Sequence, residues 1–201
     1  MLSSKAPARG RKGVRTAILD AARRLYFAHG AAGVSARRIA EAAGCSATAL
    51  YVHYRNIEDL LEHLRMEGHT LLSERLRRVD RALPAIDQVR AMGRAYFEFG
   101  VKQPHYFALM FSLRSSETPR REAVQREMHT LMVLRDVVRS GMDRGEIRSD
   151  VDVMVATNAL WAQIHGLTAL AVSRLLPETA PGQQGEVLAA VLDAAADWLA
   201  G

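Results

Sequence analysis

Apolar residues recur along most of this chain at spacings of three and four, the period of an amphipathic α-helix. The longest such stripe starts after Asn56 and continues to Pro84, and it predicts one helix of about 40 Å. Further apolar stripes begin at Pro84, Pro104, Pro119, Asp150 or Asp152, and about Gln184, the last of them running to Ala200. No segment alternates apolar and polar residues as a half-buried strand does. The pattern therefore predicts an all-α fold with about nine helices.

Two short helices joined by a glycine turn are predicted between Gly33 and Leu60. Ser35 can cap a first helix that places apolar residues on one face, and Gly44 supplies the left-handed backbone that ends it. Ser46 can cap the second helix, in which Leu50 points to the core. This arrangement is typical of a helix-turn-helix unit that reads DNA.

The outer face of the second helix carries mostly small side chains, Ala47, Thr48 and Ala49. A recognition helix must enter a groove about 12 Å wide, and bulky residues on its first turn would keep it out. The residues that follow offer hydroxyl, imidazole and guanidinium donors to phosphate oxygens: Tyr51, His53, Tyr54 and Arg55.

Positive charge is concentrated in the same part of the chain. Residues 1–55 hold ten Lys or Arg against two acids, a net charge of +8, whereas the whole chain carries +5. A polyanionic partner accounts for this asymmetry, because binding to phosphates releases counterions. We expect a disordered basic arm at residues 1–12, a helix-turn-helix DNA-binding domain at 13–55, and a C-terminal ligand-binding and dimerisation domain at 56–201.

Three segments, ILDAARRLYFAHG, GVSARRIAEAAG and RNIEDLLEHL, make residues 15–64 resemble the amino-terminal domain of the TetR/AcrR family of transcriptional regulators. The resemblance implies backbone contacts at the start of the first reader helix, a groove-facing set on the second, and phosphate clamps behind it. The expected DNA-binding residues are Ser35, Arg37, Ser46, Ala47, Thr48, Tyr51, His53 and Arg55. Because Ala47 and Ala49 stand where many relatives have a polar side chain, we expect few base hydrogen bonds and more readout of shape and thymine methyls.

Aromatic, methionine and histidine side chains gather in the second half of the chain. The segments WAQIHG at 161–166 and YFALMF at 106–111 resemble the WHG type of TetR carboxyl-terminal domain, which implies a ligand pocket. Such residues also form ordinary cores, and a histidine there can simply bond a backbone carbonyl. The residues expected to bind a small, largely apolar or aromatic effector are Tyr96, Phe99, Tyr106, Phe107, Met110, Met128, Met132, Trp161 and His165.

The last two predicted helices carry long alanine-rich apolar surfaces. Two copies of the chain could join them in an intermolecular four-helix bundle, as TetR-like proteins do, although the same surface could also be intramolecular core. The expected dimer residues are Ala156, Leu160, Leu167, Ala171, Val191, Ala195 and Leu199.

Several classes of function find no support in the sequence. There is no run of about 18 apolar residues for a membrane span, and the start MLSSKAPARGRKG lacks the apolar segment of a secretory signal. The single cysteine, Cys45, allows no intramolecular disulfide and suits a reducing cytoplasm. His63 and His69 lack the spacing of a zinc pair, and no phosphate-binding loop or nucleophile elbow is present. We expect a cytoplasmic protein that is not an enzyme and has no metal or other cofactor.

These patterns favour a homodimeric, ligand-responsive transcriptional repressor that binds a palindromic operator in double-stranded DNA and is released by its effector. Two alternatives remain at this point. One is a helical module that senses a small molecule and uses its basic arm on RNA or acidic partners. The other is a DNA-binding regulator that works without an effector. We expect no membrane partner in any of these cases.

Overall fold

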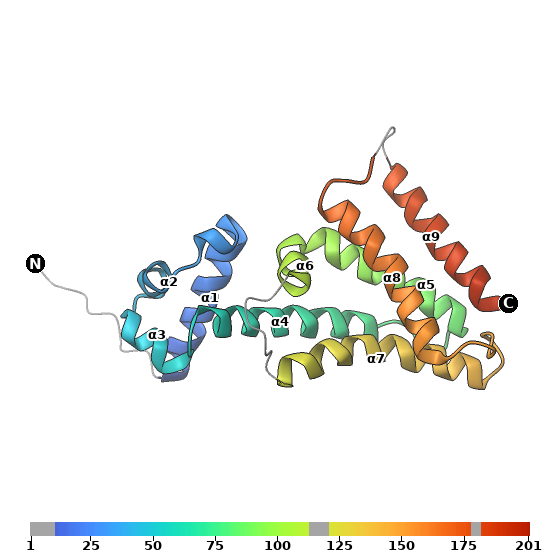
Figure 1. Ribbon diagram of the computed structural model, residues 1–201, viewed down its shortest axis with the longest axis horizontal. Coiled ribbons are helices and arrows are strands. Elements are labelled where there is room, and N and C mark those ends of the chain that lie inside the picture. The colour runs from blue at the N-terminus through green and yellow to red at the C-terminus, as the bar shows by residue number, and fades with distance from the viewer. Residues whose placement is uncertain (1–10, 113–120, 178–181) are drawn as a thin grey trace, which may run out of the picture. The chain divides into compact units, whose positions relative to one another are not determined.

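The computed structural model describes residues 11–112, 121–177 and 182–201. Over these ranges the chain forms nine α-helices and one 3-10 turn and has no strand, which confirms the predicted all-α fold (Figure 1). In chain order the elements are α1 (Arg11–His29), η1 (Ala31–Gly33), α2 (Ala36–Ala43), α3 (Ala47–His53), α4 (Ile57–Arg77), α5 (Ala85–Lys102), α6 (Pro104–Phe111), α7 (Arg121–Asp143), α8 (Val153–Val172) and α9 (Gln183–Ala200).

The described residues up to Arg65 form one compact unit, built from α1, α2, α3 and the first turns of α4. Helix α1 packs against both α2 and α3. The centre of this unit consists of fully buried apolar side chains, among them Ile18, Ile39, Leu50 and Leu60. Their burial fixes α2 and α3 as a rigid pair on α1.

The described residues from Met66 onward form the second unit. Helix α5 is its central element and packs against α6, α7, α8 and α9 (Figure 1). Close approach is possible because α5 carries glycines where its neighbours meet it: a Cβ on Gly93 would collide with Leu192, and one on Gly100 with Thr168. Of the helices within the described ranges, none is long and apolar enough to cross a lipid bilayer.

Helix α4 is shorter than the apolar stripe predicted, because it ends at Arg77 and not at Pro84. Its 21 residues correspond to about 32 Å. The chain turns where the Asp80 carboxylate accepts the Ala82 N–H at 2.9 Å, and the Gln88 amide donates to the Leu83 carbonyl at 2.7 Å. These local bonds compete with the helix, as short acidic side chains often do.

The other boundaries follow the capping signals. Asp152 begins α8, since its carboxylate accepts the N–H groups of Met154 and Val155 at 2.8 and 3.2 Å. Helix α1 begins at Arg11, inside the segment predicted to be a disordered arm, while residues 1–10 lie outside the described ranges. The predicted helix start at Pro119 also lies outside them. The chain passes between the two units after Arg65, ten residues beyond the predicted boundary.

Candidate functional site

The caps predicted for α2 and α3 are present. The Ser35 hydroxyl accepts the Arg38 N–H at 3.3 Å, and the Ser46 hydroxyl accepts the Ala49 N–H at 3.1 Å. Gly44, between the two helices, has a φ of 68°, the left-handed conformation that a turn of this kind requires. The sequence thus sets both the start of α3 and the turn before it.

Two side chains hold α3 against the rest of its unit. Leu50 is fully buried, and so is Tyr54, which ends the helix and donates a hydrogen bond to the Arg15 carbonyl at 3.3 Å. The Arg15 guanidinium lies 5.3 Å from the centre of the Tyr54 ring, and the His63 ring meets that ring edge-on at 5.2 Å. Tyr54 is therefore an anchor for α3, and its hydroxyl is engaged within the protein.

All eight residues predicted to bind DNA are at the surface. His53 is half-buried, and the other seven are exposed; Tyr51 has 52% of its side-chain surface accessible. They come from the starts of α2 and α3 and from the exit of α3. The expected residues are thus accessible in the first unit, and their role in DNA binding stays a prediction.

Sequence reasoning missed Val52, which is 60% exposed although it is apolar. At 100° per residue, Val52 lies about 200° around α3 from the buried Leu50, so it points away from the core. Projecting the helix around Leu50 could have identified it. An exposed β-branched methyl pair at this position suits contact with thymine methyls.

The junction between α3 and α4 is closed by reciprocal hydrogen bonds. The Asn56 side chain accepts the Asp59 N–H at 2.7 Å, and the Asp59 carboxylate accepts the Arg55 N–H at 2.9 Å. The Arg55 guanidinium, whose side chain is 69% exposed, lies 3.7 Å from the other Asp59 oxygen. The two hydrogen bonds fix the backbone of Arg55 and Asn56 at the start of α4.

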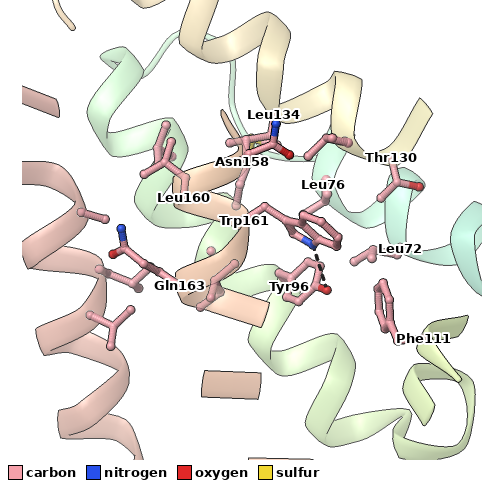
Figure 2. A pocket seen from close by; sticks show the side chains of 18 of the residues that line it. Leu72, Leu76, Tyr96, Phe111, Thr130, Leu134, Asn158, Leu160, Trp161 and Gln163 are labelled. Atoms are coloured by element: carbon pink, nitrogen blue, oxygen red, sulfur yellow. Dashed lines mark hydrogen bonds between the residues drawn. The ribbon is translucent and has the colours of Figure 1, made fainter. Parts of the chain in front are cut away.

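A cavity of about 410 Å³ lies in the second unit, enclosed by α4, α5, α6, α7, α8 and α9 (Figure 2). Four of the predicted effector residues line it: Tyr96, Met110, Met128 and Trp161. The size falls within the range of pockets that bind small organic molecules.

The other five predicted effector residues do not line the cavity, and for these the structure corrects the prediction. Phe107 packs against Gly100, and Tyr106 against Gly68 at the crossing of α6 and α4. Phe99 is buried away from the cavity, and Met132 follows the lining residue Leu131 on α7. His165 lies behind Tyr96, against the rings of Phe107 and Phe111. These five residues support the wall or the core instead.

Most of the cavity wall comes from residues that the sequence did not single out as ligand contacts. Helix α4 contributes His69, Leu72 and Leu76, and further contacts come from Met92 on α5 and Met154 on α8. Leu72 and Leu76 belong to the apolar stripe of α4, which predicts a buried face. The stripe does not indicate whether that face meets another side chain or a cavity. Four lining methionines, Met92, Met110, Met128 and Met154, give the wall adaptable side chains.

A chain of hydrogen bonds connects three polar side chains at the cavity wall. The Trp161 indole N–H donates to the Tyr96 hydroxyl at 3.4 Å, which Figure 2 marks with a dashed line. The Tyr96 hydroxyl in turn lies 2.9 Å from Nδ1 of His165. Burial raises the pKa of Tyr96 and lowers the pKa of His165, so both groups are uncharged near neutral pH.

The lowered pKa of His165 makes the protein sensitive to acid. The unfolded chain, where a histidine pKa is about 6.5, takes up this proton more readily than the folded chain. The stability that His165 contributes is therefore fully present above about pH 6.5 and is lost as the pH falls below it. A His165→Gln variant is expected to show a smaller decrease in Tm than the wild type between about pH 7.5 and 5.5 in thermal melts.

The same substitution at the exposed His105 controls for the loss of a histidine elsewhere on the surface. A His165→Gln variant with the same pH slope as the wild type would contradict the assignment.

Most residues predicted at the dimer interface are core residues of a single chain. Five of them are buried within the chain itself: Ala156, Leu160, Leu167, Ala195 and Leu199. Leu160 and Ala195 line the cavity, as does the half-buried Val191; Ala171 is also half-buried. For these five residues the intramolecular alternative holds, and the sequence could not separate the two because the buried and exposed faces of α8 and α9 are both apolar.

The accessible face of α8 is a different apolar stripe. Val155, Ala162 and Leu170 are exposed along it, and Val155 is 58% accessible. A Cβ on Gly166 would meet no atom within 4 Å in the described part of the chain. This stripe is more accessible to a second protein surface than the five buried residues of the predicted set.

Comparisons with known proteins agree with this architecture. Residues 18–64 match the family of bacterial regulatory proteins known as the tetR family, and residues 89–195 match a family described as the Tetracyclin repressor-like C-terminal domain. The second match alone spans more than half of the chain. No curated protein matches the sequence.

Several solved structures share the fold. A protein of unknown function from Rhodococcus sp. RHA1 is 24% identical, with a TM-score of 0.84 over 99% of this chain and 100% of that one. A bacterial regulatory protein of the tetR family from Rhodococcus RHA1 is 21% identical, with a TM-score of 0.71 over 92% and 96%. The transcriptional regulator FadR from Bacillus subtilis, solved in complex with stearoyl-CoA, is 20% identical, with a TM-score of 0.73 over 92% and 98%.

Proposed function

Since the chain belongs to the TetR family of transcriptional regulators, we propose that it is a dimeric repressor that binds a palindromic operator and is released by a small, largely apolar effector. Regulators of this family are generally ligand-responsive DNA-binding repressors. One observation carries the proposal: α4 begins three residues after α3 and continues, without a break, to form a wall of the cavity.

DNA recognition rests on the exposed surface of the first unit. Helix α3 enters the major groove with Thr48 and Val52 toward the bases, while Arg37 and Arg55 contact phosphates on either side. The small side chains on the first turn of α3 support its close approach to base edges. The basic charge of residues 1–55 supplies the part of the affinity that does not depend on sequence.

Arg37 provides a direct test of this division of roles. An Arg37→Ala variant is expected to bind all duplex sequences more weakly and to lower the slope of log K against log salt by about one. Fluorescence anisotropy over a salt series, with operator and scrambled duplexes, measures both quantities. A loss confined to the operator would assign Arg37 to base reading instead.

Dimerisation uses the accessible stripe of α8 in this proposal. Val155, Ala162, Gly166 and Leu170 recur at spacings of seven, four and four residues on that face, and Gly166 leaves room for a helix to come close. A symmetric pair of chains would then set its two α3 helices about 34–36 Å apart, one turn of DNA.

The effector acts through α4. His69, Leu72 and Leu76 place this helix at the wall of the cavity, and its first turn is bonded to Arg55 and Asn56, in the joint that follows α3. A ligand that binds better to a conformation with α4 displaced lowers the affinity for DNA by its difference in affinity for the two states.

The whole proposal is tested by footprinting the purified chain on DNA from upstream of its own gene, together with its sedimentation at the same concentration. We expect a dimer that protects two half-sites related by two-fold symmetry, and a binding preference of about a thousandfold or more over scrambled duplex. A monomer that binds every duplex, or single-stranded RNA, equally well would overturn it.

A further inference from the structure

Two polar groups of the cavity wall, Trp161 and Thr130, donate their single hydrogen within the protein. Trp161 has one N–H, and it points to the Tyr96 hydroxyl at 3.4 Å. Thr130 has one O–H, and it points to the His69 carbonyl at 3.4 Å. A ligand in the cavity therefore finds few hydrogen-bond donors on these two groups.

The Tyr96 hydroxyl also donates its hydrogen within the protein. A phenol is a stronger donor than a neutral imidazole N–H, and an imidazole nitrogen is a stronger acceptor than a phenol oxygen. The 2.9 Å contact is thus a bond from the Tyr96 O–H to Nδ1 of His165. The oxygen of Tyr96, which also accepts from Trp161, has a second lone pair left for a ligand.

The part of the wall that the structure describes also carries no charged side chain. Among the described residues that line the cavity, none is Asp, Glu, Lys or Arg, and the polar members are His69, Tyr96, Thr130, Asn158, Trp161 and Gln163. Asn158 and Gln163 are exposed. The polar lining residues of the interior, among those described, are therefore His69, Tyr96, Thr130 and Trp161. A carboxylate or ammonium group taken into this interior would lose its hydration without meeting an opposite charge.

We infer that the effector is an uncharged molecule with an apolar body and a hydroxyl group, an alcohol or a phenol, whose O–H donates to the Tyr96 oxygen. This inference rests on the proposed function and adds the chemical class of the ligand. A hydroxyl can donate to the Tyr96 oxygen, whereas an ether lacks the hydrogen and a carboxylate brings two more acceptors and a charge.

The test uses three probes of equal chain length: 1-decanol, decyl methyl ether and decanoate. Their binding to the full-length protein is followed by quenching of Trp161 fluorescence in a Trp198→Phe background, in which Trp161 is the only tryptophan left of two. We expect 1-decanol to bind about tenfold more tightly than the ether and roughly a hundredfold more tightly than decanoate at neutral pH.

A Tyr96→Phe variant in the same background separates recognition from structure. It is expected to weaken 1-decanol to the level of the ether while the ether itself keeps its affinity. A purely structural role of Tyr96 would weaken both probes equally, which would overturn the inference. Tyr26→Phe, in the first unit, is the matched control and is expected to change neither affinity.

The remaining outcomes distinguish failure of the hydroxyl inference from failure of the proposed function. Equal binding of the alcohol and the ether, or tightest binding of decanoate, overturns the hydroxyl inference and leaves the cavity as a ligand site. Binding of none of the three, by a chain that still binds its operator, overturns both the inference and the role of the cavity in the proposed function.

Discussion

A Thr48→Asp variant is expected to lose at least about a hundredfold in affinity for its operator, because it brings two carboxylates, one on each protomer, against a phosphate-lined groove. Thr48 is exposed on the first turn of α3, so the folded state accommodates the change without a clash. Fluorescence anisotropy with labelled operator duplex measures the loss.

The matched control for Thr48→Asp is Ala82→Asp, which adds the same charge at an exposed position in the turn between α4 and α5. It is expected to keep the affinity within about twofold at moderate salt, because exposed charges beyond a Debye length are largely screened. If both variants lost affinity to the same extent, net charge and not the position of α3 would govern binding.

Replacing Leu50 with alanine is expected to lower the free energy of opening of the first unit by about 2–5 kcal/mol, since the side chain is fully buried beneath α3. Hydrogen exchange followed by mass spectrometry, on peptides covering α2 and α3, resolves this local change from the rest of the chain. The variant is also expected to lose DNA affinity, because α3 is no longer held in place.

Val52→Ala on the same helix is the natural comparison. Val52 is mostly exposed, so its truncation is expected to change the opening free energy by no more than about 0.5 kcal/mol while it alters base preference. A costly Val52→Ala together with a harmless Leu50→Ala would mean that the inner and outer faces of α3 have been assigned in reverse.

Local signals in the sequence were sufficient for the reader unit. Ser35, Gly44 and Ser46 act within four residues of their own positions, through caps and a left-handed turn. The exposure of Ala47, Thr48 and Tyr51 on α3 could be predicted for the same reason, because Leu50 is the buried residue of this short helix.

The cavity could not be located in the same way. Phe107 and Met110 lie on one short helix and are both buried, yet only Met110 lines the cavity. Which of two apolar side chains meets a void depends on how six helices pack together. The periodicity of the sequence predicts which side chains are buried, but it does not predict how the six helices pack around a void.

The end of α4 and the faces of α8 show a second limit. The apolar stripe continues to Leu83, but the Asp80 turn stops the helix at Arg77. In α8, the exposed Val155 and the buried Ala156 are both apolar, so hydrophobicity alone does not tell the surface from the core.

The hydrogen bonds between Arg55, Asn56 and Asp59 restrain the backbone that connects α3 to α4. In the proposed mechanism, a linker of glycines would absorb part of a small rotation of α4 before it reached α3, whereas this bonded joint transmits it. In that mechanism, the size of the response to the effector depends on the stiffness of a three-residue joint, and a more flexible joint would reduce the response even with the proposed groove contacts and the cavity intact.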